Sequence, residues 1–307
     1  MSSVLYDAPG PKARARSRII SVVGIVLLAG VLVWLVLAMG APKASANGAV
    51  QPGLWDPTRW DVFTDVQVWR SLGGGVLATL QMAGAAAVIA LVLGVVFCFG
   101  RAAQHAAIRI PSTIILEFVR GLPVLLMMLF ILLVFATGAY WAGVLGLGIY
   151  NGAIIGEALR AGIQSLPRGQ REAGLAIGLT PLATRFRIEF PQAFRQMLPI
   201  IIAQLVVLLK DTSLAFIVGY SELLRVGVKN LPDFFGNRYA FSFFLVVLAI
   251  YLAMNLSLSW FARFIARRSG PKSGKLVAPA PTLTPQDTLA STRGSYSTGD
   301  AGGVGSV

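Results

Sequence analysis

The feature that most constrains the fold of this 307-residue chain is a succession of long apolar runs. A helix needs about 20 apolar residues to cross the hydrocarbon core of a bilayer. Hydrophobic residues make up 56% of the sequence and charged residues only 13%, which leaves too little polar surface to cover a water-facing globule. We therefore expect an all-α membrane protein with about six transmembrane helices. The runs occupy residues 19–39, 72–100, 112–137, 138–158, 196–220 and 239–264.

Rare residue types exclude several kinds of chemistry. Cys98 is the only cysteine and His105 the only histidine, so the sequence offers neither a disulfide framework nor a Cys- or His-rich metal site. We predict no catalytic residue and no metal ligand. The net charge of +13 does not indicate nucleic-acid binding, because the basic residues flank apolar runs instead of forming one basic face with interleaved aromatic residues.

The basic residues predict the orientation of the chain in the membrane. Segments on the cytoplasmic side carry an excess of Lys and Arg, and four such residues precede the first run within residues 12–18. Alternation then places both termini inside and residues 40–71 and 221–238 outside, and most of the 26 Lys and Arg residues fall inside. A cleavable signal peptide is the alternative for the first run, because residues 41–46 resemble a cleavage site, although the length of the run favours a retained helix.

Composition predicts the segments outside the runs. Residues 1–18 are a basic cytoplasmic N-terminus. Residues 40–71 form an outer segment whose Trp55, Trp60 and Trp69 suit the lipid headgroup region or a docking partner. Residues 265–307 are predicted to form a cytoplasmic, largely disordered tail, because Pro, Ser, Thr, Gly and Ala dominate it.

A patterned loop, residues 164–191, separates the fourth and fifth runs. Residues 170–177 can form two helical turns that end at Gly178, and Thr180 can cap a second helix. Pro191 is expected to break the chain after it. The pattern predicts a helix-turn-helix on the inner face, which either lies on lipid or contacts a partner.

Polar residues interrupt the fifth run. A charge near the centre of a membrane helix costs roughly 2.5–3.5 kcal/mol, so these side chains are expected to face protein or water. They are predicted either to line a path for the ammonium and carboxylate groups of a substrate or to fix helix packing. An ion pair between Lys210 and Asp211 is unfavourable, because adjacent side chains on a helix do not face each other. The residues are Lys210, Asp211, Thr212 and Ser213.

The fourth run combines small and polar residues. Asn151 is a candidate for substrate contact or for a hydrogen bond between helices. Glu157 and Arg160 share a helix face, where they can pair with each other, bracket a zwitterionic amino acid or anchor a gate. Glycines recur every four residues and predict close packing against another helix. They are Gly148, Gly152 and Gly156.

Gly121 and Pro123 are predicted to bend the third run or to set its start. Glu117 and Arg120 lie three residues apart just before them. We expect these two side chains to form an ion pair that positions the bend.

The loop resembles the Glu-Ala-Ala loop of ABC importer permeases, with Gly at the third alanine position and Phe where Leu is usual. The matching residues are Glu172, Ala173, Gly174, Gly178, Ile188, Phe190 and Pro191. Stretches that begin at Glu117, Gly156, Gln164 and Leu209 resemble permeases of polar amino-acid importers, the type that carries His, Glu, Gln or Arg, over about residues 70–264. Residues 4–13 resemble the D-type permease subunits of actinobacterial glutamate importers.

The resemblance implies a type I importer permease core of five helices, residues 72–264, preceded by an extra helix at 19–39, in the bacterial cell membrane. It implies a pore-forming subunit, not an enzyme, with glutamate as the expected substrate. The implied partners are a second, different permease chain, two ATP-binding cassette subunits and an extracellular substrate-binding protein. The implied ATPase contact comprises Arg171, Glu172, Ala173, Gly174, Gly178, Ile188 and Pro191.

The sequence contains no Walker-type phosphate loop, so no cofactor is expected on this chain, and ATP and Mg²⁺ are expected on the partner ATPase. An ATP-independent carrier or channel that uses Lys210 and Asp211 as an ion relay is the alternative function. A membrane enzyme is disfavoured, because the sequence offers neither a nucleophile elbow nor a metal-ligand set.

Overall fold

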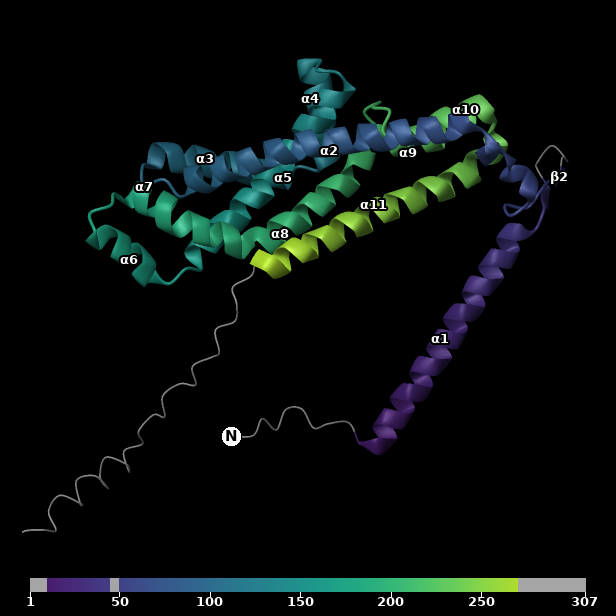
Figure 1. The fold of residues 1–307 in the computed structure, drawn as a ribbon, viewed down its shortest axis with the longest axis horizontal. Coiled ribbons are helices and arrows are strands. Elements are labelled where there is room, and N and C mark those ends of the chain that lie inside the picture. Colours follow the sequence, from purple (N-terminus) through teal and green to yellow (C-terminus); the bar gives the residue numbers. More distant parts are fainter. Residues whose placement is uncertain (1–9, 45–49, 270–307) are drawn as a thin grey trace, which may run out of the picture. The chain divides into compact units, whose positions relative to one another are not determined.

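A computed structural model describes residues 10–44 and 50–269, and residues 1–9, 45–49 and 270–307 lie outside the described residues. Helices dominate the described ranges (Figure 1). They are α1 (Pro11–Gly40), α2 (Val66–Arg101), α3 (Ala106–Gly121), α4 (Val124–Phe135), α5 (Ala139–Gln164), α6 (Arg168–Ala176), α7 (Pro181–Thr184), α8 (Phe190–Asp211), α9 (Leu223–Arg225), α10 (Leu231–Phe235) and α11 (Ala240–Ser269).

Shorter elements connect these helices. The strands β1 (Lys43–Ala44) and β2 (Val50–Gln51) form an antiparallel pair. The 3-10 or π-helical segments are η1 (Pro57–Arg59), η2 (Asp61–Thr64), η3 (Arg185–Glu189), η4 (Thr212–Phe216), η5 (Val226–Asn230) and η6 (Asn237–Tyr239). Of the predicted tail, residues 265–269 belong to α11, and the remainder lies outside the described residues.

Five helical stretches of the described residues are long and apolar enough to cross a membrane, or up to six if a bent pair counts as one span. The bent pair is α3 and α4, whose axes differ by 106°. The bend falls at Gly121 and Pro123, because the residue before a proline avoids helical backbone and Leu122 is extended there. The third apolar run is therefore two helices rather than one straight span.

The packing of α2 against α5 forms the centre of the bundle, and the glycines of α5 make it possible. A Cβ atom added at Gly148 would lie 2.7 Å from Ile89 Cγ2, and one at Gly152 would lie 2.8 Å from Leu93 Cβ. At Gly156 it would lie 2.9 Å from the carbonyl oxygen of Gly94 on α2. Only hydrogen fits at these positions, so the two backbones approach closely over about two helical turns.

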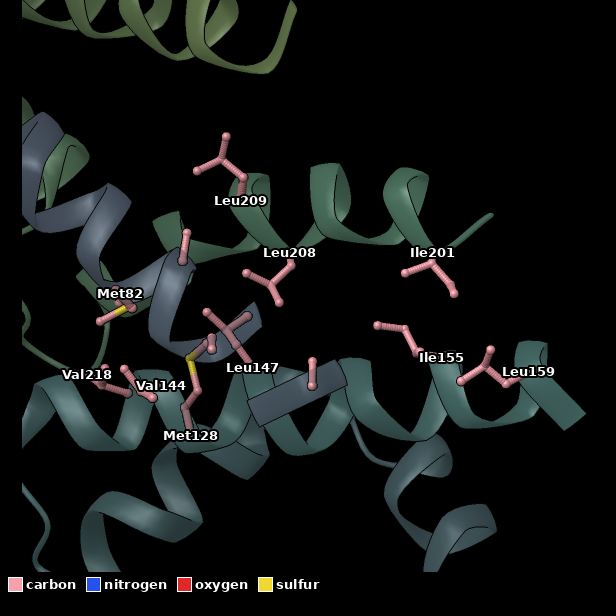
Figure 2. Close-up of a cluster of buried hydrophobic side chains, with 14 of the residues drawn as sticks. Met82, Met128, Val144, Leu147, Ile155, Leu159, Ile201, Leu208, Leu209 and Val218 are labelled. Atoms are coloured by element: carbon pink, nitrogen blue, oxygen red, sulfur yellow. The ribbon is translucent and has the colours of Figure 1, made fainter. Parts of the chain in front are cut away.

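Apolar side chains from four helices extend this contact (Figure 2). Met82 of α2 and Met128 of α4 are fully buried, and they pack against Gly143 and Gly146 of α5. Further along α5, Ile155 and Leu159 lie opposite Ile201 of α8. The cluster therefore fixes α4 and α8 against the α2–α5 pair, and it positions the ends of these helices, where the polar residues are found.

The two ends of the bundle carry different elements. Figure 1 shows α6 and α7 at one end and α9 and α10 at the other. At the α9 end, the buried Arg59 donates hydrogen bonds to the carbonyl oxygens of Pro52, at 3.2 Å, and Arg238, at 3.0 Å. This guanidinium joins the segment before α2 to the segment before α11, because it satisfies carbonyls from both.

A larger side chain at Gly156 should separate α2 from α5. We expect Gly156→Val to lower the free energy of unfolding by about 1–3 kcal/mol, because the added carbons overlap backbone atoms of Gly94. Thermal unfolding of the detergent-purified protein measures the effect. Gly84→Val on α2 is the matched control, because nothing lies within 4 Å of a Cβ added there. Equal melting of the two variants would contradict the packing role of Gly156.

Candidate coupling and substrate sites

The helix α6 ends in a tight turn at Gly178. Gly178 has a φ of +83°, and its N–H donates to the carbonyl oxygen of Leu175 at 3.0 Å. The N–H of Leu179 donates to the carbonyl oxygen of Gly174 at 3.2 Å. These two bonds form a Schellman motif, which needs a residue that tolerates left-handed backbone at the Gly178 position. The turn after α6 is therefore set by the sequence itself.

The two faces of α6 differ. Gly174 is buried, and a Cβ added there would lie 2.5 Å from Thr184 Cγ2 and 2.9 Å from Ile188 Cδ1. Arg171, Glu172 and Ala173 are exposed. One face of α6 thus packs on α7 and η3, while the carboxylate of Glu172 and the guanidinium of Arg171 remain exposed.

We call the segment that comprises α6, α7 and η3 the elbow. It continues into the next membrane helix, α8, without a break. Thr180 caps α7, because its Oγ1 accepts from the N–H of Ala183 at 3.3 Å. Pro191 does not end the helix, contrary to the expectation from sequence, and Pro181–Phe216 forms one continuous helical stretch. The reason is the π-helical η3, whose wider turn precedes Pro191 and accommodates a residue that has no N–H to donate.

Ion pairs join the helix ends near α6. On α5, Glu157 Oε1 lies 2.5 Å from Arg160 Nη2, and Glu157 Oε2 lies 2.7 Å from Nη1 of Arg101 on α2. Arg101 also lies 3.1 Å from Glu117 on α3, which is 3.7 Å from Arg120. Glu157 and Arg101 are largely buried, so their charges are better shielded from water than those of a surface pair. The network fixes three helices, and it places Glu157 and Arg160 in contact with each other.

The polar stretch that interrupts the fifth run lies where α8 gives way to η4. Lys210 is exposed and Asp211 is half-buried, and neither forms an ion pair with any described residue. Thr212 is buried and donates to the carbonyl oxygen of Leu209 at 2.7 Å. Ser213 donates to the carbonyl oxygen of Lys210 at 3.0 Å. These two hydroxyl groups therefore stabilise the turn, while Lys210 points out of the bundle.

Asn151 is fully buried and forms a hydrogen-bonded pair with a residue that sequence reasoning missed. Its Oδ1 accepts from Gln204 Nε2 of α8 at 2.7 Å, and its Nδ2 donates to the carbonyl oxygen of Leu147 at 2.8 Å. A polar side chain on each of two adjacent apolar runs was the available signal, because such residues need partners in a membrane. The pair joins α5 to α8.

Glu222 is a second buried polar residue that sequence reasoning missed. It caps α9 by accepting from the N–H groups of Leu224, at 2.7 Å, and Arg225, at 2.8 Å, and it accepts from the hydroxyl of Tyr251 at 2.6 Å. Burial raises the pKa of the Glu222 carboxyl above its usual value. The carboxylate joins α9 to α11, and its position just before a short helix was the available signal.

Within the described ranges no group of three or more His, Cys, Asp or Glu side chains could hold a metal ion. The polar groups described above instead form ion pairs and hydrogen bonds between helices, or they lie exposed at α6 and Lys210.

Comparison with known proteins identifies the class. Residues 90–270 match the family described as the binding-protein-dependent transport system inner membrane component. The match covers more than half of the chain, which therefore belongs to this family of pore-forming ABC importer permeases. Permeases of this family work with ATPase subunits and a substrate-binding protein, and they are not enzymes themselves.

Curated relatives narrow the class to amino-acid importers. The chain is 36% identical over 240 residues to the glutamate transport system permease protein GluD of Corynebacterium glutamicum, with 75% of this chain and 87% of the relative covered. It is 33% identical to the glutamine transport system permease protein GlnP of Escherichia coli K12, over 62% of this chain and 87% of the relative. The protein is thus a permease subunit of an amino-acid ABC importer.

Solved structures agree with this fold. A crystal structure of an amino-acid ABC transporter with histidines superposes with a TM-score of 0.61 at 28% identity, covering 68% of this chain and 98% of that chain. The MetNI methionine transporter, in an inward-facing form, superposes with a TM-score of 0.56 at 17% identity, covering 67% of this chain and 100% of that chain. The second likeness shows the fold alone.

The Asn151–Gln204 pair should contribute measurable stability. We expect Asn151→Ala and Gln204→Ala each to destabilise the protein, and a double-mutant cycle to give a coupling of roughly 0.6–1.7 kcal/mol, the range for hydrogen bonds between membrane helices. Reversible unfolding in mixed micelles is the measurement. Strictly additive effects would show that the hydrogen bond contributes nothing to the contact between α5 and α8.

Proposed function

We propose that this chain imports glutamate and that ATP binding and hydrolysis on partner subunits drive alternating access of its path. The observation that carries the proposal is an exposed stripe of α8 that includes Lys210. Exposed side chains recur there every three or four residues, which places them on one helix face. They are Gln192, Gln196, Ile200, Ala203, Val207 and Lys210.

An exposed stripe with a lysine cannot face lipid at low cost, because a cation at membrane depth costs roughly 2.5–3.5 kcal/mol. A second permease chain would provide a polar environment for Lys210, because a water-filled path would run between the two chains. We therefore assign the stripe to the interface of the two permease chains, and we assign Lys210 to the path.

Glutamate suits this path chemically. The ammonium of Lys210 would bind a carboxylate of the substrate, and the carboxylate of Asp211 would bind its ammonium group. Thr212 and Ser213 would set the turn that presents these two charges, because their hydroxyl groups donate to carbonyl oxygens of the same turn. The glutamate relative supports this choice, since 36% identity extends over most of both chains.

The α5 residues would serve the other end of the path. Glu157, which forms an ion pair with Arg160, lines a cavity of about 400 Å³ together with Arg120 and Tyr150. We assign Glu157 and Arg160 to a gate at the inner end of the path. The substrate would contact their charges as it leaves. Asn151 would hold α5 to α8 behind the path, because both of its polar atoms are hydrogen-bonded.

The elbow, through α6, would receive the force that a partner ATPase exerts. With both chain termini inside, α6 lies in the cytoplasm, where Arg171, Glu172 and Ala173 are available for contact with an ATPase. Two such ATPases would bind ATP and Mg²⁺, one under each permease, and an extracellular binding protein would deliver substrate at the α9 end. Gly174, Gly178, Ile188 and Pro191 would shape the elbow rather than touch nucleotide.

Reversing the charge of Glu172 tests the coupling. We expect Glu172→Lys to accumulate normally in the membrane but to lose ATPase association and at least about tenfold in glutamate uptake, because an exposed charge contact becomes repulsive. Glu172→Asp, which keeps the charge on the same helix face, should retain most of the uptake. Co-purification of the ATPase and uptake of labelled glutamate are the two measurements. Normal uptake by Glu172→Lys would refute the assignment.

Removing the charge of Lys210 tests the substrate. We expect Lys210→Met to lower glutamate uptake by about tenfold or more, because a charged hydrogen bond to the substrate is lost, and to affect glutamine uptake less. Lys229→Met is the matched control, because Lys229 is exposed outside the membrane spans. Competition between labelled glutamate and glutamine in proteoliposomes gives both values. An unchanged rate and preference would remove Lys210 from the path.

A further inference from the structure

A cavity of about 490 Å³ lies beneath α6, where the elbow meets the ends of the membrane helices. Its volume falls within the ~300–1,000 Å³ typical of small-molecule sites. Five arginines and two glutamates from four elements line it. The arginines are Arg101, Arg160, Arg168, Arg171 and Arg185.

The five arginines differ in how well they are paired. Arg101 and Arg160 both form ion pairs with Glu157. Arg185 donates to the carbonyl oxygen of Ala102, but its buried Nε finds no hydrogen-bond partner among the described residues, and Glu189 is 3.7 Å away. Arg168 and Arg171 form no ion pair with any described carboxylate. The cavity therefore presents excess positive charge and unused N–H donors.

We propose that this cavity is a binding site for an oxyanion, a phosphate or a phosphate-bearing headgroup, that enters from the cytoplasmic side. Guanidinium groups bind phosphate oxygens through paired N–H donors, and several arginines around one cavity suit a multiply charged group. Arg185 and Arg168 are the residues that bind it, because both retain donors that the protein leaves unused. Arg101 and Arg160, although paired with Glu157, add further positive charge to the same cavity.

The position of the cavity gives such an anion a mechanical effect. Arg168 belongs to α6, Arg185 to η3 and Arg101 to α2. An anion between them joins the elbow to the end of a membrane helix that the glycine contact holds against α5. Occupancy therefore favours the arrangement of α6 seen here over any arrangement in which α6 moves away from α2.

Two sources can supply a phosphate group to this cavity: the headgroup of an anionic lipid and a free phosphate in the cytoplasm. Leu182 of α7 and Phe186 of η3 are exposed, at 66% and 59%, so this surface can rest on the inner leaflet and receive the phosphate of an anionic lipid. A free cytoplasmic phosphate reaches the same arginines through the open side of the cavity. The proposal concerns residues of this chain alone and does not depend on which amino acid is transported.

Inorganic phosphate binding to the assembled, detergent-purified transporter tests the proposal, with saturating ADP present to occupy the ATPase sites. We expect phosphate to raise the melting midpoint of the wild-type complex. Arg168→Gln and Arg185→Gln should weaken the apparent Kd by on the order of tenfold each, because each loses a charged hydrogen bond. Arg187→Gln, an exposed arginine of the same elbow that does not line the cavity, should bind like wild type.

A second arm identifies the source. The same complexes are reconstituted in nanodiscs of phosphatidylcholine with phosphatidylglycerol, and the lipids retained on extraction are measured by native mass spectrometry. Retention of phosphatidylglycerol by wild type and Arg187→Gln, with loss in Arg168→Gln, assigns the site to a lipid headgroup. Phosphate binding without such retention assigns it to a free anion. Neither signal in wild type, or equal signals in all variants, overturns the proposal, and uptake assays remain a separate test of transport.

Discussion

The close approach of α2 and α5 is the contact on which the remaining structure depends. Gly148, Gly152 and Gly156 remove side chains from one stripe of α5, and the backbone of α2 occupies the space. In a bilayer no hydrophobic force drives two helices together, because lipid tails are as apolar as leucine, so close van der Waals contact must supply the attraction. This contact brings Arg101 at the end of α2 within 2.7 Å of Glu157, and the ion pairs near the elbow follow from it.

The polar residues within the spans divide into two kinds. Asn151 with Gln204, and Glu222 with Tyr251, are buried and satisfied by partners on other helices. Lys210 is exposed at membrane depth and has no ion-pair partner among the described residues. The first kind stabilises the fold of one chain. The second kind is costly in one chain alone, and the proposed surface with a second permease chain would remove that cost.

Sequence patterns predicted the local features and missed those that depend on distant residues. Apolar runs located the membrane helices, and Gly178 and Thr180 marked the end and the cap of the elbow helices, because these signals act within one or two turns. The continuation of the helix through Pro191 depends on the π turn before it, and the partner of Asn151 comes from another helix. For the candidate sites, the sequence indicated which residues are polar but not whether each is exposed, and Gln204, Glu222 and the arginine cavity emerged only from packing.

The helix that runs through Pro191 bears on how force reaches the substrate. Pro181–Phe216 is a continuous stretch of 36 residues, roughly 54 Å at 1.5 Å per residue, and it contains both α7 and Lys210. A chain break at Pro191 would have left the elbow attached to the path through a flexible joint. Because the break is absent, a displacement of α7 displaces the first turns of α8 directly. The hydrogen bond from Gln192 of α8 to Gln170 of α6, at 3.2 Å, adds α6 to the same unit. One helix thus connects the surface that a partner ATPase would move to the charge that a substrate would meet.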